Sequence, residues 1–339
     1  MVMNILYIIN CTHLAFKILS WNVAGLRGLL KKQPNALAEL ATKHSLDMIC
    51  LQETKLQEMH LTDPKLKIQD ILVEEGYESI YSCSTVKKGY SGTAVYMKIR
   101  QSVVDDDKSK KKQAKLSTFF AAKKADEESK SPASTGDIDI TDIIPTSNSC
   151  TIGKTHDGEG RIIAVFFPHF FIVNCYVPNS GQKLERLDYR TEQWDKDLIK
   201  FMREKEKELK VPGIWLGDLN VAHKAYDVWN DGAKHLSKQA GVTQQERDSF
   251  QNQLDTDGGA YIDVFRHLFP DAKGHYSYWS QRAGNREPNK GLRLDYFIAS
   301  KDFFSDEKQS KVRVRDSYII KEQESSDHCP VVLEIEVRK

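Results

Sequence analysis

The amino-acid sequence predicts an α/β fold, a four-layered α/β sandwich in which two packed mixed β-sheets are flanked by helices. Short apolar runs of strand length alternate along the chain with longer amphipathic runs that have helical spacing. The expected strands outnumber the expected helices, and sheets with apolar faces stack on each other while helices cover their outer faces. The chain has 339 residues, of which 40% are hydrophobic, which is enough to form a sizeable core.

The first part of the chain is expected to form two strand–helix units followed by a hairpin. The strands are expected at residues 16–21, 47–52, 79–84 and 92–98, and the helices at residues 35–44 and 65–76. The polar turn at residues 87–90 joins the last two of these strands.

The remainder of the chain continues the alternation. A long charged helix is expected at residues 184–209, because its apolar positions keep to helical spacing. The other expected elements are a hairpin of residues 161–167 and 171–177, a strand at 214–219, a helix at 243–254, and strands at 276–279, 292–299, 312–320 and 331–337.

The chain is expected to form one domain over residues 17–339, with two segments that stand apart from it. Residues 102–149 are rich in Lys, Asp, Ser and Thr and poor in large apolar residues, which predicts a disordered insertion within the domain. Residues 1–16 are apolar, lack a basic start and are too short to span a bilayer. We expect an N-terminal extension there, either an extra strand or a loosely attached segment, with a targeting role as the alternative. No membrane association is expected.

The formal net charge is only +1, so the molecule as a whole does not attract nucleic acid. Any such binding has to come from a local patch of Lys and Arg, and a cytosolic enzyme with a small substrate is the alternative. The six cysteines include no C-x-x-C pair, which argues against a zinc ribbon and favours free thiols in a reducing compartment.

Polar residues with catalytic potential gather at the ends of the expected strands. The four loops at residues 21–23, 52–55, 217–220 and 326–328 are rich in carboxylate, amide and imidazole groups, and Asp295 lies in a further strand. Glu53 and Asp327 offer hard oxygen ligands suited to Mg²⁺. Asp218 and Asn220 alternate across one residue and could hold an attacking water on one strand face.

The histidine in the last of these loops adds a proton donor to these possible metal ligands and water-binding residues. His328 could neutralise charge that grows on a phosphoryl oxygen, and Asp295 could accept from its other ring nitrogen. Each residue also has a structural interpretation, because Asp in a turn, an Asp–His surface pair and Asn22 as a helix cap are common. The coincidence of five such sites at strand ends favours a single active site.

The motifs in these loops resemble those of the exonuclease III / AP endonuclease family, within the wider DNase I-like endonuclease–exonuclease–phosphatase fold. The resemblance covers roughly residues 16–337 apart from the insertion. The matching stretches are S-W-N-V-A-G-L-R (20–27), L-Q-E-T-K (51–55), Y-S-G (90–92), E-G-R (159–161), Y-V-P-N-S-G (176–181), G-D-L-N-V-A-H (217–223), G-L-R-L-D-Y-F (291–297) and S-D-H-C-P (326–330). Three of them, N-V-A-G-L-R, Y-V-P-N-S-G and G-L-R-L-D-Y-F, are specific to the AP endonuclease branch.

The resemblance implies Mg²⁺, with Mn²⁺ as the alternative, held chiefly by Glu53 with Asn22 and Asp327 close by. It implies that Asp218 and Asn220 serve the attacking water and that His328, supported by Asp295, stabilises the transition state. Tyr176 and Asn179 would contact the scissile phosphate. The implied reaction is hydrolysis of double-stranded DNA on the 5′ side of an abasic site in base excision repair, with accessory 3′-phosphodiesterase and 3′–5′ exonuclease activity. A general DNase, a phosphoinositide phosphatase and a non-catalytic clamp adaptor are the alternatives.

The resemblance also places a pocket for the abasic sugar, with Tyr278 and Trp279 on its wall and Leu292 opposite. Ala24 stands where many relatives carry a carboxylate or amide, and Gln182 stands where some relatives place an Arg. DNA is expected to be gripped through its backbone by a set of basic residues in the loops near the site. These are Arg27, Lys31, Lys32, Lys55, Lys87, Lys88, Lys224, Arg282 and Arg286.

The insertion contains the sequence Q-A-K-L-S-T-F-F, in which Gln113, Leu116, Phe119 and Phe120 resemble a PCNA-interacting motif. Two aromatic residues in an otherwise polar segment have no core to serve. No acidic residue interrupts residues 108–124, which contain seven lysines, and such a run suits nuclear import or nonspecific DNA contact. We therefore expect a nuclear monomer that binds a sliding clamp, with an organelle as the alternative location through residues 1–16.

Overall fold

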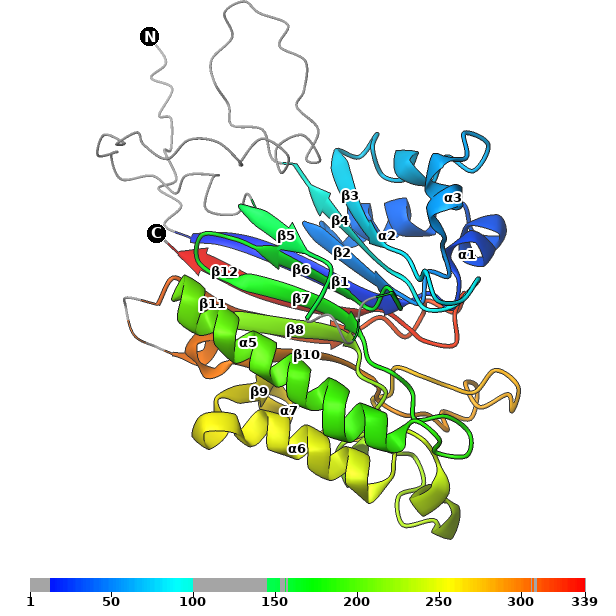
Figure 1. The fold of residues 1–339 in the computed structure, drawn as a ribbon, viewed down its shortest axis with the longest axis vertical. Helices are drawn as coiled ribbons and strands as arrows, with labels where there is room; N and C mark the ends of the chain where they lie inside the picture. The colour runs from blue at the N-terminus through cyan, green and yellow to red at the C-terminus, as the bar shows by residue number, and fades with distance from the viewer. Residues whose placement is uncertain are drawn as a thin grey trace, which may run out of the picture.

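The computed structural model describes residues 13–99, 145–152, 156, 158–305, 307 and 310–338. Two six-stranded sheets pack face to face, and helices cover their outer faces (Figure 1). This confirms the fold predicted from the sequence. No helix in the described ranges is long and apolar enough to cross a membrane.

The first sheet has the strand order β11-β12-β1-β2-β4-β3. Its strands β1 and β2 are parallel, and the other neighbouring pairs are antiparallel. The strands are β1 (His13–Asn22), β2 (Met48–Gln52), β3 (Tyr77–Ser82), β4 (Thr93–Lys98), β11 (Val312–Ile319) and β12 (Val331–Arg338). Strand β1 begins before Phe16, so the last residues of the expected N-terminal extension belong to this sheet.

The second sheet has the strand order β5-β6-β7-β8-β10-β9, with β7 and β8 parallel. Its strands are β5 (Ser147–Ser149), β6 (Ile162–Phe166), β7 (Phe171–Tyr176), β8 (Gly213–Asp218), β9 (Tyr261–Asp263) and β10 (Asp295–Ser300). Strand β5 lies at the end of the segment expected to be disordered, where its residues pair with β6.

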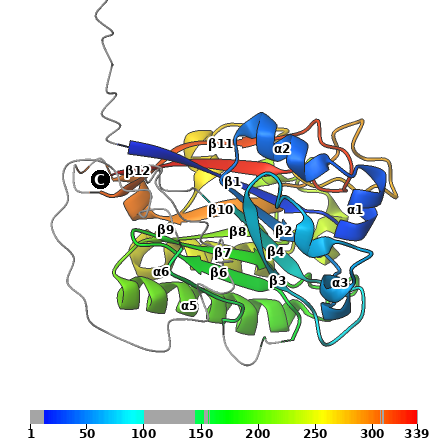
Figure 2. The same cartoon turned by 90° about the horizontal axis from the view of Figure 1, so that it is seen from above.

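The helices cover the two outer faces of this sandwich (Figure 2). The helices are α1 (Leu26–Lys32), α2 (Ala36–His44), α3 (Glu58–Thr62), α5 (Asp195–Leu209), α6 (Gln244–Gly259) and α7 (Val264–Leu268), of which α7 contacts β10 and β11 from the two sheets. Helices α1 and α2 pack their apolar residues on the first sheet, and α5 and α6 pack theirs on the second. A Thr243–Glu246 capping box starts α6 by satisfying backbone N–H groups that its first turn leaves free.

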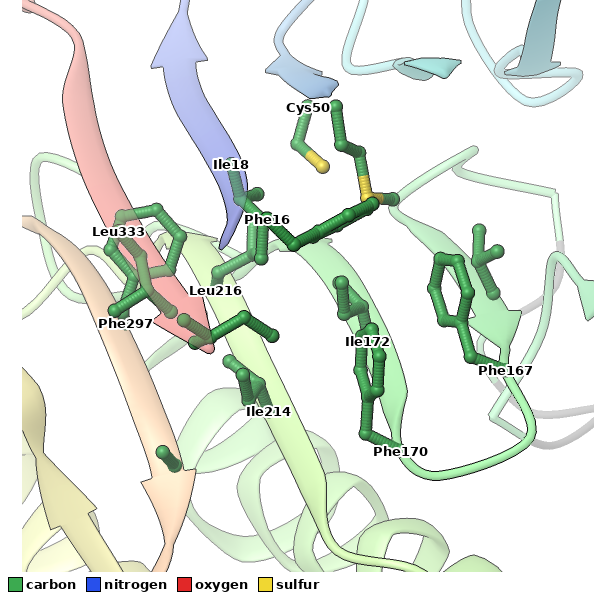
Figure 3. Close-up of a cluster of buried hydrophobic side chains, with 14 of the residues drawn as sticks. Phe16, Ile18, Cys50, Phe167, Phe170, Ile172, Ile214, Leu216, Phe297 and Leu333 are labelled. Atoms are coloured by element: carbon green, nitrogen blue, oxygen red, sulfur yellow. The ribbon is translucent and has the colours of Figure 1, made fainter. Parts of the chain in front are cut away.

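The core lies between the two sheets (Figure 3). Phe16, Ile18 and Cys50 from the first sheet face Ile172 and Leu216 from the second. Strands β2, β6 and β8 are buried along their whole length, because one face meets the other sheet and the opposite face meets a helix layer. The rigid stack holds the strand ends in place, and the site is built on those ends.

Several predicted elements differ from the structure. The helix predicted at residues 65–76 is wrong: a single 3-10 turn at Ile68–Asp70 stands there, between left-handed residues at Lys67 and Leu72. Ile68 and Leu72 have the spacing of a helix face, which led to the helix prediction, and both are buried. The chain buries them with a series of turns instead of a helix. The strand predicted at residues 276–279 reduces to isolated bridges of Tyr278.

The long helix begins later than predicted. Leu184 has a left-handed backbone, and the helix starts with a π-helical turn at Tyr189–Trp194 that continues into α5. The clamp-binding residues, the lysine run, residues 1–12 and residues 100–144 lie outside the described residues.

Candidate active site

A cleft of about 530 Å³ opens where the ends of the strands from both sheets meet. Strand β1 ends at Asn22 beside the end of β2, and Asp218 at the end of β8 pairs with Asp295 at the start of β10. These ends lie on the side of the molecule where α1 begins (Figure 1). The predicted residues that line the cleft are Asn22, Glu53, Tyr176, Asn179, Asp218, Asn220, Tyr278, Leu292, Asp327 and His328.

His328 lies between two buried carboxylates. Its Nδ1 is 2.7 Å from Oδ2 of Asp295, and its Nε2 is 3.8 Å from Oδ2 of Asp218. Burial lowers the pKa of His328, but Asp295 and then Asp218 outweigh it and raise the pKa to about 10. The imidazole is therefore an imidazolium at neutral pH, with Nε2–H as the donor that faces the cleft.

Two hydrogen bonds fix the carboxylate of Asp218. Its Oδ2 accepts from the Asn22 side chain at 2.9 Å, and its Oδ1 accepts from the Asn220 backbone N–H at 2.9 Å. Burial raises the pKa of Asp218 while the positive His328 opposes that rise. A buried carboxylate with a raised pKa is a suitable base for a bound water.

The amide side chains beside Asp218 form a chain of hydrogen bonds. Asn179 donates through Nδ2 to Oδ1 of Asn220 at 2.9 Å, and Asn220 donates through Nδ2 to the Val177 carbonyl at 2.9 Å. Asn220 has a left-handed backbone with φ of 50°, which turns the chain sharply after β8. The two amides are therefore fixed on the wall of the cleft.

Glu53 projects into the cleft from the loop after β2. Its Oε1 is 2.9 Å from Nζ of Lys55, and both residues have left-handed backbones. The ammonium group shows that this carboxylate accommodates a cation. Asp218, Asp295 and His328 each place one possible ligand atom within 4.8 Å of the others and could also hold a metal ion, in competition with the proton on His328. The oxygen donors at Glu53, Asn22 and Asp327 fit a hard divalent cation better.

Arg161 packs against Tyr176, which lines the cleft. Its guanidinium lies 4.6 Å from the Tyr176 ring centre and donates to the Tyr176 carbonyl at 2.9 Å. Glu159 and Tyr90 bind the same guanidinium. The Y-S-G and E-G-R stretches therefore hold Tyr176 in position.

Residues that were not predicted connect the loops around the cleft. Buried Arg190 donates to the carbonyls of Leu219 and Asn220, and buried Glu246 accepts from Ser180 and from the Gly241 backbone N–H. Residues 238–241 also line the cleft. The T-x-x-E pattern of the α6 capping box is the one sequence signal of this network, and it predicts a helix start without indicating the loops that Glu246 reaches.

The pocket predicted for an abasic sugar is partly in the cleft. Tyr278 and Leu292 line it, and the Tyr278 ring lies 4.9 Å from that of His328. Trp279 is buried and is not among the lining residues. Its indole donates to Asn289 at 3.1 Å.

The predicted DNA-gripping residues are mostly solvent-exposed. Lys55 and Arg286 are half-buried, and Arg286 donates to the backbone carbonyls of Ser326, Lys321 and Gln323. Arg286 thereby holds the loop that precedes Asp327. The exposed residues are Arg27, Lys31, Lys32, Lys87, Lys88, Lys224 and Arg282.

Comparison with known proteins identifies relatives over nearly the whole chain. The model of the endonuclease/exonuclease/phosphatase family matches residues 19–328. An exodeoxyribonuclease of Bacillus subtilis is 35% identical over 322 residues, which is 95% of this chain and 100% of that protein. A DNA-(apurinic or apyrimidinic site) endonuclease of Dictyostelium discoideum is 35% identical over 93% of this chain and 69% of its own length. The solved AP endonuclease LMAP from Leishmania major is 29% identical, with a TM-score of 0.71 over 96% of this chain and 88% of its own.

Proposed function

This chain belongs to the endonuclease/exonuclease/phosphatase family, and we propose that it is a DNA-(apurinic or apyrimidinic site) endonuclease of base excision repair. It hydrolyses the phosphodiester on the 5′ side of an abasic site. The observation that carries the proposal is the single cleft that joins the His328–Asp295 pair, Asp218 and Glu53 to the apolar wall of Leu292. A flipped-out sugar that lacks its base can pack against such an apolar wall.

The side chains of the cleft divide the hydrolysis between them. Asp218 takes a proton from the attacking water, with Asn220 as its neighbour, and the water oxygen forms the new bond to phosphorus. His328 donates Nε2–H to the phosphoryl oxygen on which negative charge grows. The bond from phosphorus to the 3′ oxygen breaks, and that oxygen takes a proton to leave a 3′-hydroxyl. Tyr176 and Asn179 orient the phosphate.

Glu53, with Asn22 and Asp327, would hold Mg²⁺ or Mn²⁺ beside this phosphate. The chemistry that such a cation supplies is neutralisation of charge on the phosphoryl and leaving oxygens. The cation would compete with Lys55, whose Nζ is 2.9 Å from Oε1 of Glu53, and would weaken that ion pair. Lys55 would then be available for a DNA phosphate.

Incision of an end-labelled duplex with one tetrahydrofuran site, in Mg²⁺ and in EDTA, tests this function. We expect cleavage 5′ to the tetrahydrofuran in Mg²⁺ and none in EDTA. His328→Asn should lower the rate by about 100- to 1000-fold, as the loss of an oxyanion donor does in other hydrolases. His44→Asn, on α2 and far from the cleft, is the matched control and should have no effect. Equal cutting of an undamaged duplex would favour a general DNase instead.

A 3′–5′ exonuclease or 3′-phosphodiesterase activity is a second function of the same cleft. Its support is the name of the Bacillus subtilis relative, which is an exodeoxyribonuclease. The same residues would act on a phosphodiester next to a 3′ end. Release of single nucleotides from a recessed 3′ end, measured beside incision, tests it, and its loss in His328→Asn would assign both activities to one site.

We also propose that the insertion binds a PCNA-type sliding clamp through Gln113, Leu116, Phe119 and Phe120. The support is the sequence pattern. Phe119→Ala with Phe120→Ala should abolish capture by immobilised clamp while incision continues. Ser117→Ala with Thr118→Ala is the matched control, and unchanged capture by the Phe variants would contradict the proposal.

Nuclear location is a related proposal and rests on the run of lysines at residues 108–124. Replacement of the first three adjacent lysines, at residues 110–112, by Ala should move a fluorescent fusion out of the nucleus. An unchanged distribution would contradict it, and a fusion without residues 1–16 would test the organelle alternative.

A further inference from the structure

Trp229 is the one tryptophan that the fold leaves in solvent. Its side chain is 44% exposed, whereas Trp21, Trp194, Trp215 and Trp279 are at most 3% exposed. Single exposed aromatic rings are common on protein surfaces. Exposure alone therefore does not mark Trp229 as a binding residue, but its position and the charges around it do.

Trp229 is attached to the wall of the cleft. Its backbone N–H donates to the Gly291 carbonyl at 3.1 Å, and the preceding residue, Val228, forms a β-bridge with Leu292. Leu292 lines the cleft, and so does Lys238 from the same connection between β8 and α6. The backbone of Trp229 therefore lies at the rim of the cleft, beside the segment that contributes Leu292 to the cleft lining; this segment is yellow-green in Figure 1.

The rim around Trp229 is cationic. Lys290 places Nζ 5.1 Å from the centre of the indole ring. Lys234 and Lys238 are exposed, and no carboxylate of a described residue forms a salt bridge with either of them. The rim therefore presents ammonium groups that are available to an anionic ligand.

The acidic residues of the same segment do not offset these lysines. Asp231 pairs with Arg247 at 2.9 Å. Asp227 is fully buried and pairs with Arg293 at 2.7 Å and Arg266 at 2.7 Å. Both carboxylates are neutralised internally, so the exposed rim keeps a positive charge.

We propose that Trp229, Lys234, Lys238 and Lys290 form a binding surface for an unpaired stretch of the DNA strand that flanks the cleavage site. We name these four residues the rim. That the rim binds DNA beside a cleavage site rests on the proposed function. Lysines that track phosphates, combined with an aromatic ring on which a base stacks, are how proteins bind single strands without reading sequence. In a paired duplex both faces of each base are already stacked, so the indole can act only on an unpaired base. An acidic peptide would satisfy the lysines but would leave the ring without a stacking partner.

Intrinsic tryptophan fluorescence tests contact at the rim directly. Because the other four tryptophans are buried, quenching by acrylamide reports on Trp229. A short single-stranded oligothymidylate, added to the full chain in EDTA, should protect Trp229 from acrylamide. Trp229→Phe should remove the quenchable signal. Lack of protection by the oligonucleotide, or stronger protection by polyglutamate, would overturn the proposal.

Binding measurements test what the rim selects. Two tetrahydrofuran duplexes, identical except that one has an unpaired flank beside the site, are compared in EDTA to prevent cleavage. Trp229→Ala should reduce the preference for the unpaired flank by about five- to a hundredfold, the effect of losing one stacked base. Leu209→Ala, 38% exposed at the end of α5 and just before the start of β8, is the control and should leave the preference unchanged.

The outcomes separate the rim from the proposed function. An unchanged preference in Trp229→Ala overturns the rim, whatever the wild-type incision rate. A reduced preference together with absent incision of the paired tetrahydrofuran duplex by the wild type supports the rim as a single-strand surface and rejects the endonuclease.

Discussion

Replacement of Asp295 by Asn tests how the cleft keeps its histidine charged. Asp295 is buried, its Oδ2 lies 2.7 Å from Nδ1 of His328, and it contributes most to raising the pKa of His328 against the opposing effect of burial. The amide has nearly the same shape but carries no charge. Oδ1 of Asp295 has no hydrogen-bond partner, so an NH₂ group placed there would also be buried and unpaired.

The expected loss of incision rate follows from the hydrogen bond between Asp295 and His328. A hydrogen bond between charged groups contributes about 1.5–3 kcal/mol, which corresponds to about a 10- to 150-fold loss of incision rate. In the folded wild type the pKa of His328 is raised to about 10 from 6.5. The pair therefore adds stability that is fully present below pH 6.5 and is lost as pH rises through about 10. Asp295→Asn should lower the pKa of His328 and remove this stabilisation.

NMR titration of the imidazole signals in EDTA measures the pKa without interference from a bound metal. The signal that is missing in His328→Asn identifies the residue. The wild-type signal should titrate near pH 10, and the Asp295→Asn signal at a clearly lower pH. An unchanged midpoint, or an incision rate within twofold of wild type, would refute the assignment of Asp295 as the group that holds His328 in its charged form.

Three further changes test the metal ligand, a buried ion network and a close backbone approach. Glu53→Gln should raise the Mg²⁺ concentration needed for half-maximal incision by about tenfold or more, whereas exposed Glu58→Gln should not change it. Arg293→Met should destabilise the protein by about 3–5 kcal/mol in urea unfolding, because it removes the buried cation that Asp227 and Asp263 share and leaves Asp227 with Arg266 alone; a loss under 1 kcal/mol would contradict this. Gly217→Ala should lower stability by about 2 kcal/mol or more, since φ is 131° and the new Cβ would collide with the Cys175 carbonyl; Gly28→Ala meets no atom within 4 Å and is the control.

Much of the fold was predictable because its strands are short, apolar and bounded by polar turns. The hairpins β3–β4 and β6–β7 and the strands β2 and β8 match their predicted positions within two residues. Helix α2 was equally clear, with Asn35 at its start and a left-handed Ser45 at its end. These elements depend on local pattern, which a single sequence contains.

The errors arose where tertiary contacts replaced local preference. Ile68 and Leu72 have helical spacing, but the loop buries them by turns alone, in the apolar cluster on the outer face of the first sheet. Tyr278 is held by bridges to Leu292 and His328, which are distant in the sequence. The short strand β9 is stabilised by its pairing with β10, so its own sequence does not indicate it.

The sequence by itself determined which groups stand at the strand ends, because apolar alternation locates the strands and polar residues such as Glu53, Asp218 and His328 follow or precede them directly. Only the tertiary structure decided which of those groups meet. The 2.7 Å bond of His328 to Asp295, the network around Glu246, the displacement of Trp279 from the cleft lining and the exposure of Trp229 all depend on contacts between distant segments. Such contacts form when two sheets pack face to face, because the sheets also bring together segments that lie far apart in the sequence, as the pairing of β1 with β12 does.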